Sequence, residues 1–151
     1  MRYIFILLTF FISITFLKAN EFEYKHLALG TWEITGTHYC PNVCALDDEQ
    51  ASSYSGTIIE LLKFEANVGD KNCRDVSYLY RHLTSTKFVQ KNRYHPARIG
   101  IDGDTVVEVS LYCGGLFGER LTDMASHFYI KNQNEILISF DGVNFLAKRI
   151  K

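Results

Sequence analysis

The sequence contains little proline and no long run of one charge. Only two of its 151 residues are proline, and the formal net charge is −1 at pH 7. Proteins that bind nucleic acid usually carry clustered Lys and Arg, and because no such cluster is present, nucleic acid is not expected as a partner. Aromatic residues make up 14% of the chain. Together with the low proline content, this predicts a packed, β-rich domain rather than a disordered chain.

The short motifs of several enzyme classes are also missing. No Gly-x-Ser-x-Gly elbow presents a serine nucleophile, and the histidines show neither the HExxH nor the His-x-His spacing of a metal site. The glycine-dense stretch YCGGLFGER, residues 112–120, lacks the Lys-Ser/Thr pair of a phosphate loop. We therefore expect a protein that acts by binding, with no turnover, cofactor or metal. The histidines are expected at the surface or half-buried in strands: His26, His38, His82, His95 and His127.

The first 19 residues have the layout of a secretory signal peptide. Arg2 forms a short basic segment, residues 3–17 are almost entirely apolar, and Ala19 is a small residue suited to cleavage. As a helix, this apolar stretch would span only about 22 Å, short of the roughly 30 Å hydrocarbon core of a bilayer. No stable membrane anchor is therefore expected. We predict export to the periplasm or the extracellular space, and a single domain over residues 20–151.

Export changes the interpretation of the cysteines. An even number of cysteines in an oxidising compartment first indicates a disulfide framework. Of the three possible pairings we favour Cys40–Cys44 and Cys73–Cys113. The second would close a long loop, which in the chain-entropy model stabilises the fold by roughly 4 kcal/mol. Two alternatives remain: zinc bound by His38, Cys40 and Cys44, and redox catalysis, which prefers Cys-x-x-Cys to the Cys-x-x-x-Cys found here.

Alternating side chains mark the first strand, in GTWEITGTHYC, residues 30–40. A period of two residues places every second side chain on the same face of a strand. The stretch ALDDEQASSYSG, residues 45–56, then predicts a short helix or ordered loop that Asp47 or Asp48 caps and Gly56 ends. One face of the first strand carries Trp32, Ile34, Gly36, His38 and Cys40.

The rest of the chain predicts further strands separated by turns. Residues 89–100 have no clear period and predict a loop or short helix. Turns are expected at Asn132-Gln133-Asn134 and at Asp141-Gly142, where both residues tolerate a positive φ. About eight short strands in sequence predict a small antiparallel up-and-down β-barrel, which removes exposed sheet edges by closing. The predicted strands are 57–66, 75–88, one within 101–113, and three between 126 and 150.

The two ends of the chain resemble a known superfamily. LGTWEI, residues 29–34, resembles the Gly-x-Trp first strand of the calycins, which include lipocalins, fatty-acid-binding proteins and avidins. In lipocalins a late basic residue packs over that tryptophan, and Arg149 in NFLAKRI matches it. The resemblance implies a lipocalin-like barrel closed by a cation–π contact between Arg149 and Trp32. Met124 stands where the aromatic of the middle lipocalin motif, Thr-Asp-Tyr, is expected.

Two sets of residues are predicted to form binding surfaces, one for a small ligand and one for a protein partner. Strand parity predicts a pocket-facing set for a small apolar or amphipathic ligand: Ile34, His38, Leu62, Phe64, Val109 and Leu111. The glycine-rich loop predicts a rim set that would contact a protein of the cell envelope: Tyr112, Leu116, Phe117, Glu119 and Arg120. Glu60 either shares the pocket face or is turned to solvent by a shifted register.

These surfaces lead to a first function and an alternative. The first is an exported, non-enzymatic barrel that holds a small apolar or amphipathic ligand. The alternative is an inhibitor or immunity protein that acts on a cell-envelope enzyme through its rim loops. A hollow barrel interior would favour the ligand-binding function. A barrel filled by its own side chains, with an ordered loop over residues 114–120, would favour the inhibitor function. Clustered acid–base residues in a pocket would favour an enzyme.

Overall fold

A computed structural model describes residues 24, 26–41, 44–115, 118–121 and 124–151, and the predicted signal peptide lies outside these residues. The described chain is mostly antiparallel β-structure. Besides the helical residues 24 and 26–28, its helical elements are α2 (Asp48–Ser53), α3 (Ser85–Asn92) and the 3-10 helix η1 (Pro96–Ile99). The strands are β1 (Gly30–Tyr39), β2 (Ile58–Leu61), β3 (Glu65–Val68), β4 (Lys71–Arg74), β5 (Ser77–Thr84), β6 (Thr105–Cys113), β7 (Glu119–Arg120), β8 (His127–Ile130), β9 (Glu135–Phe140) and β10 (Val143–Arg149).

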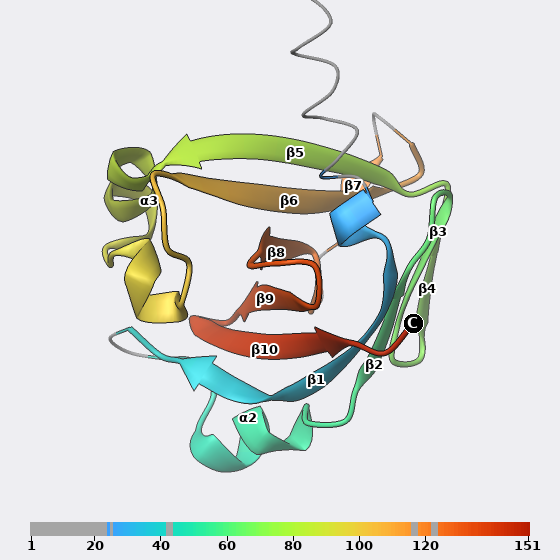
Figure 1. Ribbon diagram of the computed structural model, residues 1–151. Coiled ribbons are helices and arrows are strands. Elements are labelled where there is room, and N and C mark those ends of the chain that lie inside the picture. The colour runs from blue at the N-terminus through green and yellow to red at the C-terminus, as the bar shows by residue number, and fades with distance from the viewer. Residues whose placement is uncertain (1–23, 25, 42–43, 116–117, 122–123) are drawn as a thin grey trace, which may run out of the picture.

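All ten strands belong to one curled sheet, with the order β4-β3-β2-β1-β10-β9-β8-β6-β5 and with β7 beside β6. Figure 1 shows the sheet curling from β5 and β6 at the top to β10 and β1 at the bottom, with β3 and β4 at the right. The last strand returns to the first, and Trp32 pairs with Arg149. The all-β, up-and-down prediction is confirmed. The sheet has ten strands rather than about eight, and it is a half-barrel because β4 and β5 do not pair.

The predicted strand over residues 57–66 is two strands joined by a turn. Leu61 pairs with Ala66, and the Leu62 N–H donates to the Glu65 carbonyl at 2.8 Å across the turn. The buried side chains of β2 are Ile59 and Leu61, so the face predicted from Ile58 and Leu62 is the outer one. The register is shifted by one residue from the prediction, which is enough to exchange the two faces of a strand.

The strand parity that placed Leu62 and Phe64 on the inward face is therefore wrong. Both residues lie in the turn after β2, where the alternation of a strand no longer applies, and their exposed fractions are 45% and 67%. Glu60 lies on the outer face of β2, and its carboxylate accepts a hydrogen bond from the Asn67 side chain at 3.0 Å. The solvent-facing alternative for Glu60 is the observed one.

The predicted strand over residues 75–88 ends at Thr84 and continues as a helix. The Thr84 hydroxyl accepts a hydrogen bond from the Lys87 N–H at 3.3 Å, so Thr84 is the N-cap of α3. A cap satisfies an N–H that the first helical turn leaves without a partner. The helix ends at Arg93, which has a φ of 66°. The prediction of a strand over residues 75–88 is therefore wrong after Thr84, because the capping threonine begins a helix there.

Two bulges interrupt the alternation of β1. Trp32 and Ile34 are buried as predicted, but the pairing with β10 shifts after Ile34 and again after Thr37. Each shift inserts one extra residue into β1, and His38 lies at the second bulge, between the paired residues Thr37 and Tyr39. His38 is exposed there, and the prediction that it faces a pocket is wrong. Tyr39 is the residue that packs inward, with its ring 5.3 Å from the ring of Tyr94.

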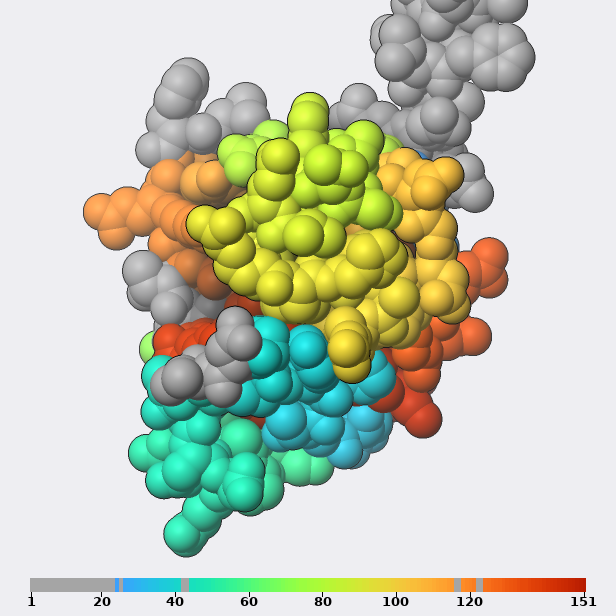
Figure 2. All heavy atoms as spheres, turned by 90° about the vertical axis from the view of Figure 1, so that its left-hand side faces the viewer, coloured from blue at the N-terminus to red at the C-terminus, as the bar shows by residue number. Residues whose placement is uncertain are grey.

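The sheet has an apolar core on each face. We call the face that carries Trp32, Val109 and Phe128 the large-core face, and the opposite face the helix-covered face. Figure 2 shows the yellow-green and yellow atoms of α3 and η1 above the cyan atoms of β1 on this side of the molecule. The buried residues of the helix-covered face are Phe88, Ile99, Ile101, Val106, Tyr129 and Leu137.

The two predicted disulfides are confirmed. Cys40 and Cys44 are bonded with a Cα–Cα distance of 6.2 Å, and Cys73 and Cys113 with one of 5.5 Å. The second joins β4 to β6 and so spans the place where β4 and β5 fail to pair. The Gly115 N–H also donates to the Asp75 carbonyl at 2.7 Å. A covalent bond and loop hydrogen bonds therefore bridge the two ends of the sheet here without closing the gap between β4 and β5.

The predicted contact between Arg149 and Trp32 is present. The Arg149 guanidinium lies 4.1 Å from the centroid of the buried Trp32 ring, within cation–π range. The same guanidinium donates to the carbonyls of Leu29 at 2.6 Å and Leu27 at 2.7 Å. The indole N–H of Trp32 donates to the Ala28 carbonyl at 3.1 Å. These bonds fix the segment before β1 against the end of the sheet.

Candidate functional site

An apolar pocket lies at the open side of the half-barrel, between the β2–β3 turn and β5. Its volume is about 280 Å³. Aromatic and aliphatic side chains form most of its walls, and Lys63 supplies the charged group. Ligand sites in proteins are commonly concave and mostly apolar, with a few polar groups that fix the ligand. The residues that line this pocket are Leu29, Lys63, Phe64, Val76, Ser77, Tyr78 and Tyr80.

Two hydrogen bonds hold the β2–β3 turn against β5. The Tyr78 hydroxyl donates to the Leu62 carbonyl at 2.7 Å, and the Val76 N–H donates to the Phe64 carbonyl at 3.2 Å. Burial raises the pKa of Tyr78, and the nearby Tyr80 adds to this shift, so the phenol stays protonated as a donor. The turn is thereby positioned with Phe64 exposed at the mouth of the pocket, and the Lys63 ammonium lies 4.9 Å from the Phe64 ring.

The predicted pocket-facing residues are mostly elsewhere. Ile34, Val109 and Leu111 have no exposed surface and pack in the large core, so they contact no ligand-sized space. Of the predicted set, only Phe64 lines the pocket. The sequence did contain a signal for the residues that were missed. In VSYLY, residues 76–80, the alternation of Val76, Tyr78 and Tyr80 places large apolar side chains on one face of β5.

The predicted rim set is only partly described. Tyr112 is half-buried and pairs with Arg120, while Glu119 and Arg120 are exposed on the short strand β7. Leu116 and Phe117 lie outside the described residues. The described rim residues therefore place one acidic and one basic side chain beside β6.

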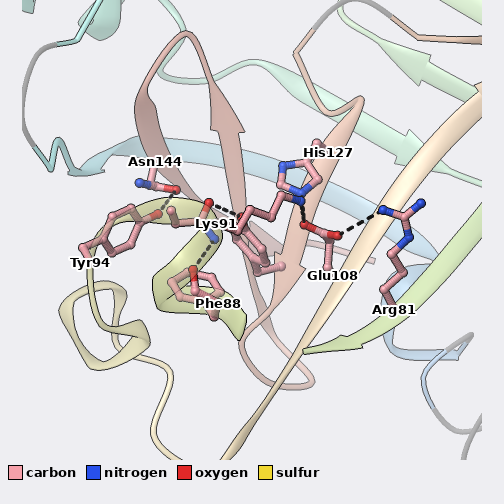
Figure 3. Close-up of polar contacts among 9 residues, drawn as sticks. Arg81, Phe88, Lys91, Tyr94, Glu108, His127 and Asn144 are labelled. Atoms are coloured by element: carbon pink, nitrogen blue, oxygen red, sulfur yellow. Dashed lines mark hydrogen bonds and ion pairs between the residues drawn. The ribbon is translucent and has the colours of Figure 1, made fainter. Parts of the chain in front are cut away.

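A buried polar network, shown in Figure 3, lies on the helix-covered face. The Glu108 side chain on β6 is only 1% exposed. Its carboxylate lies 2.6 Å from Nε2 of His127 and 4.0 Å from the Arg81 guanidinium, and it accepts a hydrogen bond from the Lys91 ammonium. A buried carboxylate must be paired and hydrogen-bonded to be tolerated. Strands β5, β6 and β8 and helix α3 together supply that pairing.

The charges around Glu108 keep it ionised. Desolvation raises the pKa of the Glu108 carboxyl, but hydrogen bonds and positive charge from His127 and Lys91 outweigh it and lower the pKa from 4.5 to about 2. Because the carboxylate carries no proton, the Nε2 of His127 must donate the hydrogen bond between them. A neutral His127 therefore carries its proton on Nε2, and its Nδ1 is a hydrogen-bond acceptor.

Neighbouring polar groups extend the network along α3. The Tyr129 hydroxyl donates to the Asn92 side chain at 3.0 Å, and burial raises the pKa of Tyr129. The Tyr94 hydroxyl donates to the buried Asn144 side chain at 3.2 Å. Sequence patterns gave no role to these residues. The one available signal was Glu108, a lone acid between valines in TVVEVS, residues 105–110.

Neither site has the ligand set of a metal centre. Among the described residues, no group of three or more His, Cys, Asp or Glu side chains is placed to hold a metal ion. In that same part of the chain, no helix is both long enough and apolar enough to cross a bilayer.

Comparisons with protein-family models, with characterised proteins and with solved structures find no match to this chain.

Proposed function

We propose that this chain is an exported, non-enzymatic binding protein that holds a small apolar or amphipathic ligand in the pocket beside Phe64. The observation that carries the proposal is an apolar, aromatic-walled pocket with an exposed phenylalanine at its mouth. A concave, mostly apolar pocket with apolar surface exposed at its mouth is the usual form of a ligand site. Two disulfides support an oxidising compartment, which agrees with export.

The pocket limits what the ligand can be. Its volume of about 280 Å³ is near the lower end of the range for ligand sites, so a small molecule or one end of a longer chain fits. Tyr78 and Tyr80 suit an aliphatic or aromatic group. The ammonium of Lys63 at the same wall suits an anionic or polar head. An amphipathic ligand with an apolar tail inward and a negative group at Lys63 matches both features.

A distant relation to the calycins is part of this proposal. The return of β10 onto β1 and the position of Arg149 over Trp32 support a lipocalin-like architecture. The proposed site differs from the axial cavity that the resemblance implied, because Val109 and Leu111 are packed without exposed surface. The ligand is therefore expected at the open side between β4 and β5 rather than at the centre of the barrel.

Titration with an environment-sensitive apolar dye tests the proposal. The wild-type protein should take up the dye saturably. Phe64→Arg should raise the dissociation constant by on the order of tenfold or more, because it places a charge where the apolar group binds. Leu79→Arg is the matched control, since Leu79 is an exposed apolar residue next to the pocket residues but on the other face of β5.

Two results would contradict this function. One is dye uptake that Phe64→Arg leaves unchanged, which would place the bound dye elsewhere. The other is the absence of saturable uptake of any apolar probe by a folded wild-type protein. A circular-dichroism spectrum and a denaturation midpoint for each variant would establish that the loss of binding is not a loss of folding.

A second candidate is an inhibitor or immunity protein that binds an envelope enzyme. The observation that favours it is the outer edge of β5, with which no strand among the described residues pairs. An unpaired edge can accept an extended segment of a partner, and Leu79 on β5 is 40% exposed. A stable complex with an envelope protein that survives Phe64→Arg and is lost in Leu79→Arg would favour this candidate over the first.

A further inference from the structure

A second depression lies beside β7 and the adjoining ends of β8 and β9. Its volume is about 360 Å³, and it shares no lining residue with the pocket beside Phe64. Its character is different, because charged residues and hydroxyls form much of its wall. The lining residues are Arg120, Leu121, Ser126, His127, Ser139, Phe140 and Asp141.

Strand register brings the polar lining residues together. Along β6, Ser110 is paired with His127 and Tyr112 with Arg120, so His127 and Arg120 lie beside the same strand and on the same face. The alternation along β9 puts Ser139 on this face as well. The chain between β7 and β8 carries Ser126 into the same wall. Residues from three chain segments therefore surround one small space.

The network around Glu108 lies behind one wall of this depression. His127 belongs to both, since its Nε2 is bonded to Glu108 while the residue lines the depression. The ionised carboxylate accepts the hydrogen bond from Nε2 and so orients the imidazole ring. When His127 is protonated, its Nδ1 becomes an additional donor.

The fixed charges leave an excess of positive charge in this region. Arg81 and Lys91 are paired with Glu108, whereas Arg120 makes no ion pair among the described residues. Among the described residues, Asp141 is the one carboxylate that lines the depression. Tyr129, whose pKa is raised by burial, remains neutral behind it. In this described part of the chain, three cations thus stand beside the two carboxylates Glu108 and Asp141, and Arg120 is the cation without an ion pair.

We propose that this depression binds a tetrahedral oxyanion of the phosphate or sulfate type, either as a free ion or as the terminal group of a larger molecule. The planar guanidinium of Arg120 suits two oxygens of such a group. The hydroxyls of Ser126 and Ser139 supply donors for the others, and His127 Nδ1 adds a donor whenever the ring is protonated. A tetrahedral oxyanion has enough oxygens to accept from Arg120 and from the neighbouring side-chain donors at once, whereas a carboxylate offers only two oxygens.

Calorimetric titration of the purified exported protein with inorganic phosphate, and separately with sulfate, tests the proposal. Sodium chloride at matched ionic strength controls for screening. Saturable binding is expected, and Arg120→Ala should weaken it by on the order of tenfold, as for the loss of one charge-assisted hydrogen bond. Asp141→Asn should strengthen it, because the repelling carboxylate is removed while asparagine tolerates the φ of 48° at this position.

The matched control is Arg98→Ala, which removes an exposed arginine from η1, outside the depression, and should leave binding unchanged. Two results would overturn the proposal: an effect that chloride reproduces at equal ionic strength, or binding that Arg120→Ala and Arg98→Ala reduce equally. Because Arg120 is exposed, its variant should keep the denaturation midpoint measured without anion, which separates lost binding from lost folding.

A further comparison separates the two sources of the oxyanion. Vesicles of phosphatidylcholine, with and without phosphatidic acid, present the group on a lipid, and inorganic phosphate presents it free. Binding to either that depends on Arg120 supports the site, and the stronger of the two identifies the source. Arg120-independent binding to both, or binding to neither, overturns it. Neither outcome affects the proposed function, because dye binding beside Phe64 uses other residues.

Discussion

The two faces of the sheet are stabilised in different ways. The large-core face is filled by aliphatic and aromatic side chains that alternate along the strands, such as Trp32, Val109 and Phe128. The helix-covered face has a smaller apolar core and beside it the buried carboxylate of Glu108 with its cations. Apolar burial depends on area and volume and is insensitive to direction. The ionic network depends on the position of each partner, because an unpaired buried charge is strongly destabilising.

This difference predicts different responses to mutation, salt and pH. Substitutions on the large-core face should cost stability by an amount that hardly varies with pH or ionic strength, since they change only apolar contacts. Substitutions in the Glu108 network should have effects that depend on both. The expected loss in the free energy of unfolding decreases from the large apolar core, through the Glu108 network, to the partly buried Arg149.

The largest effect is expected from Trp32→Ala. The ring is fully buried in the large core and is the platform for Arg149, so its removal leaves a cavity. We expect a loss of about 3–5 kcal/mol in the free energy of unfolding. Urea denaturation at pH 7 and again at pH 5 measures it. An unchanged midpoint, or a loss that differs strongly between the two pH values, would contradict the assignment of Trp32 to a purely apolar core.

The next effect is the loss of stability in acid caused by Glu108. Its pKa is about 2 in the folded protein, against 4.5 ordinarily, so the carboxylate stabilises the fold above pH 4.5. That contribution, on the order of 3 kcal/mol, should be lost as the pH falls from about 4.5 through about 2. Denaturation of the wild type and of Glu108→Gln between pH 7 and pH 2 measures it. If both proteins lose stability in parallel, another group is responsible.

A smaller effect is expected from Lys91→Met, which removes one cation and keeps the length of the side chain. Glu108 then loses a hydrogen bond and a charge partner, while Arg81 and His127 remain. We expect a loss of about 2 kcal/mol at pH 7. The control is Lys87→Met, which changes an exposed lysine of the same helix and should have little effect. Equal effects of the two substitutions would show that the helix, and not the ion pair, responds.

The smallest effect is expected from Arg149→Ala. The guanidinium makes a cation–π contact with Trp32 and donates to backbone carbonyls of the segment before β1, but it is only partly buried. We expect a loss of about 1–2 kcal/mol, smaller than that of Trp32→Ala. A double-mutant cycle of the two substitutions measures their coupling. Strict additivity would contradict an energetic contact between the two side chains.

Much of the architecture could be predicted because it depends on local signals. Alternating apolar residues predicted the last three strands, and Asp141-Gly142 predicted the hairpin between β9 and β10, where both residues have positive φ. Asp47 or Asp48 was expected to cap a short helix, and Asp47 caps α2 with its carboxylate accepting from the Gln50 N–H. Each of these features is decided by neighbours within a few residues, so the sequence carries the information directly.

Predictions failed where a single residue shifts the register. The bulges in β1 expose His38, and the turn after β2 exposes Leu62 and Phe64. Neither feature has a strong local signal, since a bulge is fixed by the pairing of two distant strands. Successive side chains of a strand point to opposite faces, so a register error of one residue moves a residue predicted to line a pocket into the core or onto the surface. The candidate site was therefore predicted less well than the strands that form it.

The sequence by itself determined the strand-rich, up-and-down character of this protein, the capping and hairpin residues, and the cysteines available for pairing. Tertiary structure alone decided that β4 and β5 would stay unpaired, that the pocket would lie at that opening, and that Glu108 would meet Lys91 and His127. The physical reason is one of range. Propensity and alternation act between neighbours, whereas the pairing of buried charges and the opening of a barrel depend on residues that are distant in the chain and adjacent only after folding.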